Sequence, residues 1–226
     1  MKGDLPPRSR FGQILARGRA LLALRVLVAL LPLAACVPTA QVYLERFGSA
    51  EPTPAHFTVC HGYGCLARSG IALSPVEFAA VGEIFATPAP DGAAERRQIG
   101  DGVTAMQRLV GLRLGTFRHQ RRSLINTGDL TQLDCIDETV NTITYLRLFE
   151  RAGWLRRHAI SAPATRGTVL TLDFGNTPTI VDRASGARYA VDSHLVDAGT
   201  PPAIVPLTLW LSGWTPDDPE TRVLRN

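Results

Sequence analysis

Lysine is almost absent from this chain of 226 residues, because Lys2 is the only lysine among its 24 basic side chains. Schiff-base enzymes, P-loop nucleotide-binding proteins and Ser–Lys hydrolases all need a lysine in the active site. The sequence beyond Lys2 therefore excludes these three classes. It also shows no motif for a bound cofactor, and we expect none.

Long apolar runs are missing as well. The run Val26–Ala35 is too short for the ~20 apolar residues that a membrane-spanning helix needs. It follows a basic segment and suits the core of a signal peptide over residues 1–35. The alternative is an uncleaved N-terminal anchor that begins near Ala20 and includes Arg25.

The end of this run, Leu33-Ala34-Ala35-Cys36, resembles the lipobox of bacterial lipoproteins. In that class the chain is cut before the cysteine, which is lipidated and becomes the new N-terminus. The resemblance implies lipidation at Cys36 and a membrane anchor on the periplasmic side of the bacterial cell envelope. Val37 stands where an aspartate commonly retains lipoproteins at the inner membrane, which slightly favours the outer membrane.

Basic residues are concentrated in the leader. Residues 1–35 contain six basic residues and one acidic residue, so the rest of the chain carries 18 basic against 19 acidic side chains. A nearly neutral remainder gives no reason to expect nucleic acid as a partner. Its length suits one domain. We assign 36–55 to a tether, 56–215 to the domain and 216–226 to a polar tail.

Cysteine is scarce, with four in the chain. Cys60 and Cys65 flank a glycine-rich loop that can bend back on itself, which predicts a disulfide in an oxidising compartment. A metal site with His61, or two free thiols, is the less favoured alternative, because zinc needs four ligands and no second pair has suitable spacing. With Cys36 lipidated, Cys135 is the odd thiol.

The segment Leu133–Gly153 predicts a helix. Asp134 is a good N-cap, Gly153 suits the C′ position, and apolar residues recur at steps of three and four. Cys135 then lies at the positive end of the helix, where free N–H groups favour thiolate, so we expect a pKa below the ~8.5 of a free cysteine. The plain alternative is a small buried side chain.

Three short runs rich in β-branched residues, Thr168–Phe174, Thr177–Val181 and Arg188–Ser193, predict strands, with a hairpin turn at Asp182–Ala187. A cysteine at a helix start followed by such a hairpin resembles the transglutaminase-like, papain-related cysteine proteinases. The stretch GDLTQLDCIDETVNTITYL is most similar to the Cys-x-Asp helix of their bacterial members.

The resemblance implies an α+β, papain/transglutaminase-like fold, with N-terminal helices packed on a small antiparallel sheet. In that family the cysteine is the nucleophile, a histidine on the first hairpin strand is the base, and an aspartate on the next strand orients it. Cys135 matches the nucleophile and Asp192 matches the aspartate. The histidine position falls at Gly175 or Asn176, and neither can take a proton. His194 is the best substitute base.

Other predicted elements fill the remaining domain. We expect strands at His56–Cys60 and Leu66–Leu73, helices from Ser74 to about Ala86 and over Ala93–Leu112, and a short closing helix within Pro206–Gly213. The loop Leu114–Gln132 is arginine-rich. It is either simply solvated or rims a cleft that attracts carboxylates such as those of peptidoglycan stems. His158 is expected at the surface of a strand edge.

Two functions follow from these residues. The first is an exported, lipid-anchored binding or structural module of the envelope, with peptidoglycan or an envelope protein as partner and no complete catalytic triad. The alternative is an envelope cysteine hydrolase or acyl-transferase that acts on peptide bonds, with Cys135, Asp192 and His194 as nucleophile, orienting acid and base.

Overall fold

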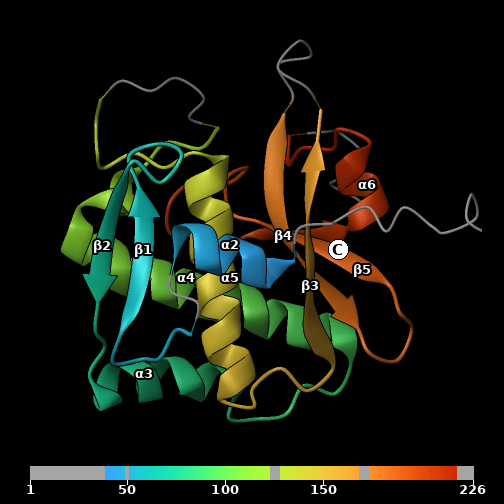
Figure 1. Ribbon diagram of the computed structural model, residues 1–226. Coiled ribbons are helices and arrows are strands. Elements are labelled where there is room, and N and C mark those ends of the chain that lie inside the picture. The colour runs from blue at the N-terminus through green and yellow to red at the C-terminus, as the bar shows by residue number, and fades with distance from the viewer. Residues whose placement is uncertain (1–38, 49–50, 123–127, 168–173, 218–226) are drawn as a thin grey trace, which may run out of the picture. The chain divides into compact units, whose positions relative to one another are not determined.

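The helix α5 (Cys135–Arg151) lies between two antiparallel β-sheets (Figure 1). It contacts the strand β1 on one side and the strand β4 on the other. The sequence predicts one buried apolar face for this helix, but polar residues of the helix are buried too. Thr139 and Thr144 satisfy their hydroxyl groups by donating to backbone carbonyls one turn earlier. Burial on all sides is therefore compatible with polar side chains.

The computed structural model describes residues 39–48, 51–122, 128–167 and 174–217. All of them belong to the unit Pro38–Asn226. The signal peptide, Cys36, the segment 168–173 of a predicted strand and most of the polar tail lie outside these residues. Within the described ranges, no helix is both long enough and apolar enough to cross a membrane.

The smaller sheet is a hairpin of β1 (Phe57–His61) and β2 (Ala67–Ile71), close to the two predicted strands. The connecting loop needs left-handed backbone at Gly62 and Gly64, with φ of 80° and 64°. Glycine adopts these angles without steric cost. The hairpin packs Phe57 and Val59 into the main hydrophobic core.

The larger sheet has the order β3-β4-β5-β6, so consecutive strands are neighbours throughout. Its strands are β3 (His158–Arg166), β4 (Gly175–Asp182), β5 (Arg188–Asp192) and β6 (Ala203–Pro206). The predicted turn between β4 and β5 is confirmed, with Asp182 N–H donating to Ala187 O. The chain is thus a mixed α+β protein with two antiparallel sheets, as expected at that level.

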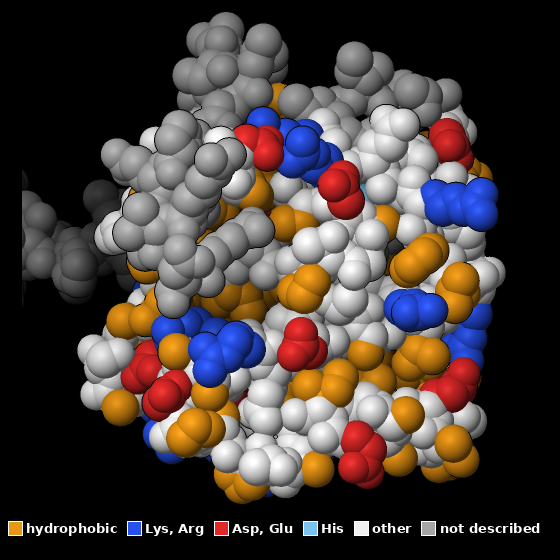
Figure 2. Space-filling view, turned by 180° about the vertical axis from the view of Figure 1, so that it is seen from behind, with side chains coloured by type: hydrophobic (Ala, Val, Ile, Leu, Met, Phe, Trp, Pro, Cys, Tyr) orange, Lys and Arg blue, Asp and Glu red, His pale blue; other side chains and the backbone are white. Residues whose placement is uncertain are grey.

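Among the described residues, four further helices surround these sheets: α2 (Ala40–Phe47), α3 (Pro75–Gly82), α4 (Gly92–Leu114) and α6 (Leu207–Leu211), together with the 3₁₀ turns Glu83–Phe85 and Thr116–Arg118. A capping box of Ser74 and Glu77 opens α3, close to the start that the sequence predicts. Four apolar residues of α4 are buried, namely Ile99, Val103, Met106 and Val110. Figure 2 shows acidic, basic and hydrophobic side chains interspersed among the described residues of the rear face.

Several regions differ from expectation. The strands β3 and β6 lie outside the strand ranges that the sequence predicts. The predicted tether contains α2, which packs Ala40 and Leu44 against Ile143 of α5. His158 is not a surface residue, because its side chain is fully buried and its Nδ1 lies 2.7 Å from Oε2 of Glu95. Glu95 also accepts the backbone N–H groups of residues 156–158. The contacts of Glu95 have no local sequence signal, since its partners are 61–63 positions away in the chain.

Gly102 of α4 is required by close packing. A Cβ at this position would lie 2.8 Å from the Phe85 ring and 3.2 Å from the Phe149 ring. We therefore expect Gly102→Ala to lower the free energy of unfolding by about 1–3 kcal/mol, although alanine is the better helix former. Urea unfolding of the full-length protein measures this.

Gly100→Ala is the matched control on the same helix, because its Cβ would meet Pro201 at an ordinary 3.5 Å. Its higher helix propensity should leave stability unchanged or raise it by up to ~1 kcal/mol. Equal effects of the two substitutions would contradict the packing explanation.

Candidate functional site

The start of α5 is built by two carboxylates on either side of Cys135. Asp134 is the N-cap, and its Oδ1 accepts the N–H groups of Ile136 and Asp137 at 3.0 and 2.9 Å. The side chain of Asp137 accepts the N–H of Asp134 in return, which completes a capping box. The predicted cap is confirmed, and Cys135 is the first residue of the helix.

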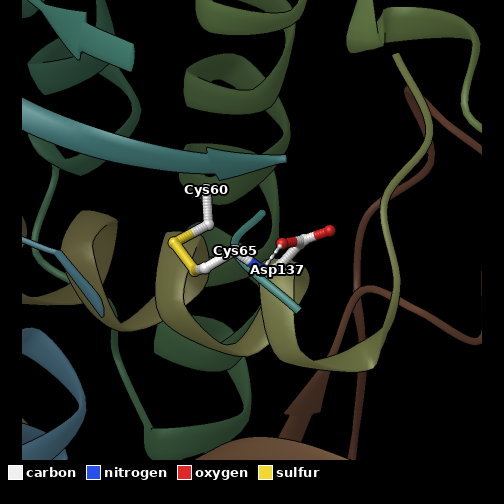
Figure 3. A group of neighbouring side chains, drawn as sticks. All are labelled: Cys60, Cys65 and Asp137. Atoms are coloured by element: carbon white, nitrogen blue, oxygen red, sulfur yellow. Dashed lines mark hydrogen bonds between the residues drawn. A yellow bond between two sulfur atoms is a disulfide. The ribbon is translucent and has the colours of Figure 1, made fainter. Parts of the chain in front are cut away.

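The same carboxylates bind the loop between β1 and β2. Asp137 accepts the N–H groups of Tyr63 and Cys65 at 2.8 and 2.7 Å, and Asp134 accepts that of Gly64. The predicted disulfide between Cys60 and Cys65 closes this loop (Figure 3). The loop and the helix start therefore form one hydrogen-bonded unit beside the thiol.

Cys60, Cys65 and Asp137 have potential ligand atoms within 4.8 Å of one another. The disulfide removes both thiolates, however, and the Asp137 oxygens already accept backbone N–H groups. In this oxidised form the three side chains cannot coordinate a metal ion. Burial and the neighbouring Asp134 raise the pKa of Asp137 to about 7.

The Cys135 thiol faces Asn176 of β4. The Asn176 Nδ2 lies 3.8 Å from the sulfur. Its Oδ1 accepts the hydroxyl protons of Thr165 and Tyr43 at 2.8 and 3.4 Å, which orients the NH₂ group towards the thiol. An amide in this orientation donates to the sulfur and cannot accept its proton. Of the two predicted histidine positions, Asn176 is the one whose side chain reaches the thiol.

The predicted low pKa of Cys135 is wrong. The side chain is buried, and burial is the main cause of a pKa above the ordinary value for a thiol. Hydrogen bonds from Asn176 lower the pKa, while the charges of Asp134 and Asp192 raise it further. Burial is thus the largest influence on the pKa of Cys135, because a buried thiolate loses much of its hydration.

Asp192 lies at the end of β5, the strand next to β4. Its Oδ2 accepts the indole N–H of Trp210 at 2.6 Å, and its Oδ1 accepts the N–H of Leu195 at 3.1 Å. Burial raises the pKa of Asp192 to about 6, and the Trp210 hydrogen bond opposes this. The hydrogen bonds that orient the Asp192 carboxylate therefore come from Trp210 of α6 and from the Leu195 backbone, and not from an imidazole.

His194 follows β5 and is also buried. Its Nε2 is buried without a hydrogen-bond partner, and burial lowers the pKa of the imidazole. Its carbonyl accepts the N–H of Arg122 at 2.9 Å, which ties the arginine-rich loop to the end of β5. All five histidines lie within the described ranges, and among the hydrogen bonds there, none joins an imidazole to the Cys135 sulfur.

A cavity of about 130 Å³ brings these residues together. Its polar lining includes all three predicted site residues and four others, namely Cys135, Asp192, His194, Asn176, Arg122, Arg166 and Trp210. Arg166 is buried, with its guanidinium 4.6 Å from the Trp210 ring. Its Nη1 donates to the carbonyls of Trp210 and Trp214. Neither Arg166 nor Trp210 has a signal in the sequence, because only the tertiary structure brings β3 and α6 to the start of α5.

Residues of the arginine-rich loop have three different surroundings. Arg122 lines the cavity. Arg121 instead pairs with Asp217 and Asp197 at the surface. His119 is buried, with Nε2 2.9 Å from Oε1 of Glu138. The prediction that the loop is simply solvated is therefore wrong for His119, which is buried. The prediction that it rims a cleft agrees with Arg122, which lines the cavity.

The raised pKa of Asp192 predicts a specific dependence of stability on pH. A carboxyl that keeps its proton better in the folded state stabilises the fold most below its ordinary pKa of 3.8. This contribution is lost as pH rises through about 6. The stability of the wild type relative to Asp192→Asn, which cannot titrate, should fall by on the order of 1–3 kcal/mol between pH 4 and 7.

Urea unfolding across this pH range measures the difference. Asp101→Asn, at an exposed carboxyl of α4, is the matched control and should show no such trend. A relative stability of the wild type that stays constant or increases with pH would contradict the assignment.

The geometry of the site can be compared with known proteins. The chain matches no protein-family model, no curated protein and no solved structure. A transglutaminase-like fold therefore stays a prediction from the sequence.

Proposed function

We propose that this chain is an exported, lipid-anchored protein of the bacterial cell envelope, in which a transglutaminase-like domain binds an envelope polymer or protein instead of cleaving it. The lipobox-like Leu33–Cys36 supports the anchor and the periplasmic location, and Val37 favours the outer membrane. The Cys60–Cys65 disulfide agrees with an oxidising compartment.

The arrangement of three residues supports the relation to the papain/transglutaminase-like fold. Cys135 begins a buried helix, Asn176 faces it from one strand, and Asp192 lies on the next strand. The family places its cysteine, histidine and aspartate in the same order of elements. In this chain an amide takes the place of the base.

The amide of Asn176 in place of a base is the main observation in support of the proposal. A cysteine nucleophile needs a neighbouring base that accepts its proton and later protonates the leaving group. Asn176 can do neither, and the pKa of the buried Cys135 is raised, so the thiol stays protonated near neutral pH. The cavity beside the thiol has a polar lining, which suits binding without covalent chemistry.

The alternative is a cysteine hydrolase or acyl-transferase with His194 as base. It is favoured by one observation, which is that Cys135, Asp192 and His194 line the same cavity. This mechanism needs the imidazole to reach the sulfur from the strand that carries the acid. It predicts that iodoacetamide labels Cys135 of the wild type faster than a model thiol below pH 7.

Restoring the base tests the proposed relation. We expect Asn176→His to accelerate iodoacetamide labelling of Cys135 at pH 7 at least ~10-fold over the wild type, because an imidazole beside the thiol stabilises thiolate. The wild type should react more slowly than N-acetylcysteine. The rates are measured by mass spectrometry of the Cys135 peptide.

Asn176→Gln is the matched control, because it keeps an amide and adds no base. Equal labelling rates for Asn176→His and Asn176→Gln would show that position 176 is not where the family's base is missing. Rapid labelling of the wild type below pH 7 would instead support the hydrolase.

Binding to the envelope polymer is tested by sedimentation of full-length protein with purified peptidoglycan sacculi. We expect the wild type to sediment with sacculi, and Cys135→Ala to do so with an affinity within about twofold, because the proposed binding uses no covalent bond. Chitin, a related glycan without peptide stems, is the control polymer.

Two results would contradict this expectation. Failure to sediment with sacculi would exclude peptidoglycan as the partner. Loss of binding in a folded Cys135→Ala protein would show that capture depends on the thiol, as in a covalent enzyme intermediate.

A further inference from the structure

The cavity beside Cys135 is rich in hydrogen-bond donors. Arg122 and Arg166 contribute guanidinium groups to its lining, and Asn176 contributes an amide NH₂ group. A ligand that complements this lining must offer acceptors and negative charge.

The one carboxyl group in the lining is already engaged. Both oxygens of Asp192 accept hydrogen bonds from the protein, one from Trp210 and one from Leu195. Its pKa is raised by burial, so it carries less negative charge near neutral pH than an ordinary aspartate. With a pKa of about 6 it is still mostly ionised at pH 7, so it offsets the charge of Arg166 and leaves that of Arg122.

His194 is a further polar residue of the lining. Its side chain is 5% exposed, and burial lowers the pKa of the imidazole, which favours the neutral form. His194 therefore adds no full positive charge to that of the arginines.

We infer that this cavity binds a carboxylate, with Arg122 as its principal charge partner and Asn176 as a neutral donor. The inference rests on the proposed function, in which the cavity binds without catalysis. Arg122 is suited to this role because its backbone N–H is fixed to the His194 carbonyl while its side chain is exposed at the cavity. A guanidinium group matches a carboxylate with two parallel hydrogen bonds.

The size of the cavity limits what can enter it. About 130 Å³ is well below the volume of a drug-sized ligand site. The ligand must therefore be a terminal or side-chain group of a larger molecule, and not a whole saccharide unit or an extended peptide. The candidates are the C-terminal carboxylate of a peptide and an acidic side chain.

The test uses calorimetry of the full-length protein with three short peptides. N-acetyl-Ala-Ala offers a terminal carboxylate, N-acetyl-Glu-Ala-amide offers a side-chain carboxylate, and N-acetyl-Ala-Ala-amide offers neither. We expect at least one acidic peptide to bind ~10-fold or more tightly than the neutral one, and the tighter of the two identifies the source of the carboxylate. Equal binding of all three, or binding of none, would overturn the inference.

Two variants assign the interaction to the cavity. We expect Arg122→Gln to reduce affinity for the acidic peptide at least ~10-fold, towards that of the neutral peptide. Arg118→Gln removes the same charge from an exposed residue four positions earlier and should change affinity less than twofold. Equal losses in both variants would overturn the inference, since they would indicate general charge attraction.

Failure of the carboxylate site can be distinguished from failure of envelope binding. Sedimentation with sacculi that persists in Arg122→Gln, together with no preference for acidic peptides, would refute the carboxylate site and leave envelope binding intact. Loss of sedimentation in Arg122→Gln but not in Arg118→Gln would link the two.

Discussion

The capping of α5 by Asp134 and Asp137 is the interaction on which the site depends. These carboxylates lie at the positive end of the helix, and they also accept N–H groups from the disulfide loop between β1 and β2. The two side chains thus cap the helix and hold the loop against its first turn, with Cys135 as the first helical residue. The thiol of Cys135 faces Asn176 on β4.

Two opposing effects act on that thiol, and their magnitudes decide its state. A helix N-terminus stabilises a negative charge by roughly 0.3–2 kcal/mol, whereas full burial of an ionisable group shifts its pKa by up to 3–5 units. Burial is the larger effect at Cys135, even with donors from Asn176 beside it. Cysteine proteinases overcome burial with an imidazolium ion next to the sulfur. A neutral amide at the same place leaves a protonated thiol, which is the physical basis for assigning this domain to binding.

Buried charges elsewhere in the molecule serve the fold. Glu95 accepts three consecutive backbone N–H groups at the start of β3 and pairs with His158. Glu138 of α5 lies beside His119 in the same manner. The Glu95 pair joins α4 to the start of β3, and the Glu138 pair joins α5 to the turn that follows α4. Buried ion pairs are costly unless their remaining hydrogen bonds are satisfied, and Glu95 meets that condition through the backbone.

The sequence alone determined the features that depend on neighbouring residues. The caps of α3 and α5, the disulfide loop, the β4–β5 hairpin and the position of Cys135 at a helix start all follow from residues a few positions apart, where sterics and hydrogen bonding are local. Only the tertiary structure decided that α2 packs on α5, that His158 is buried, that Arg166 and Trp210 line the cavity, and that burial raises the pKa of Cys135. These depend on contacts between segments distant in the chain, and burial is a property of the whole fold, so no local pattern reports it.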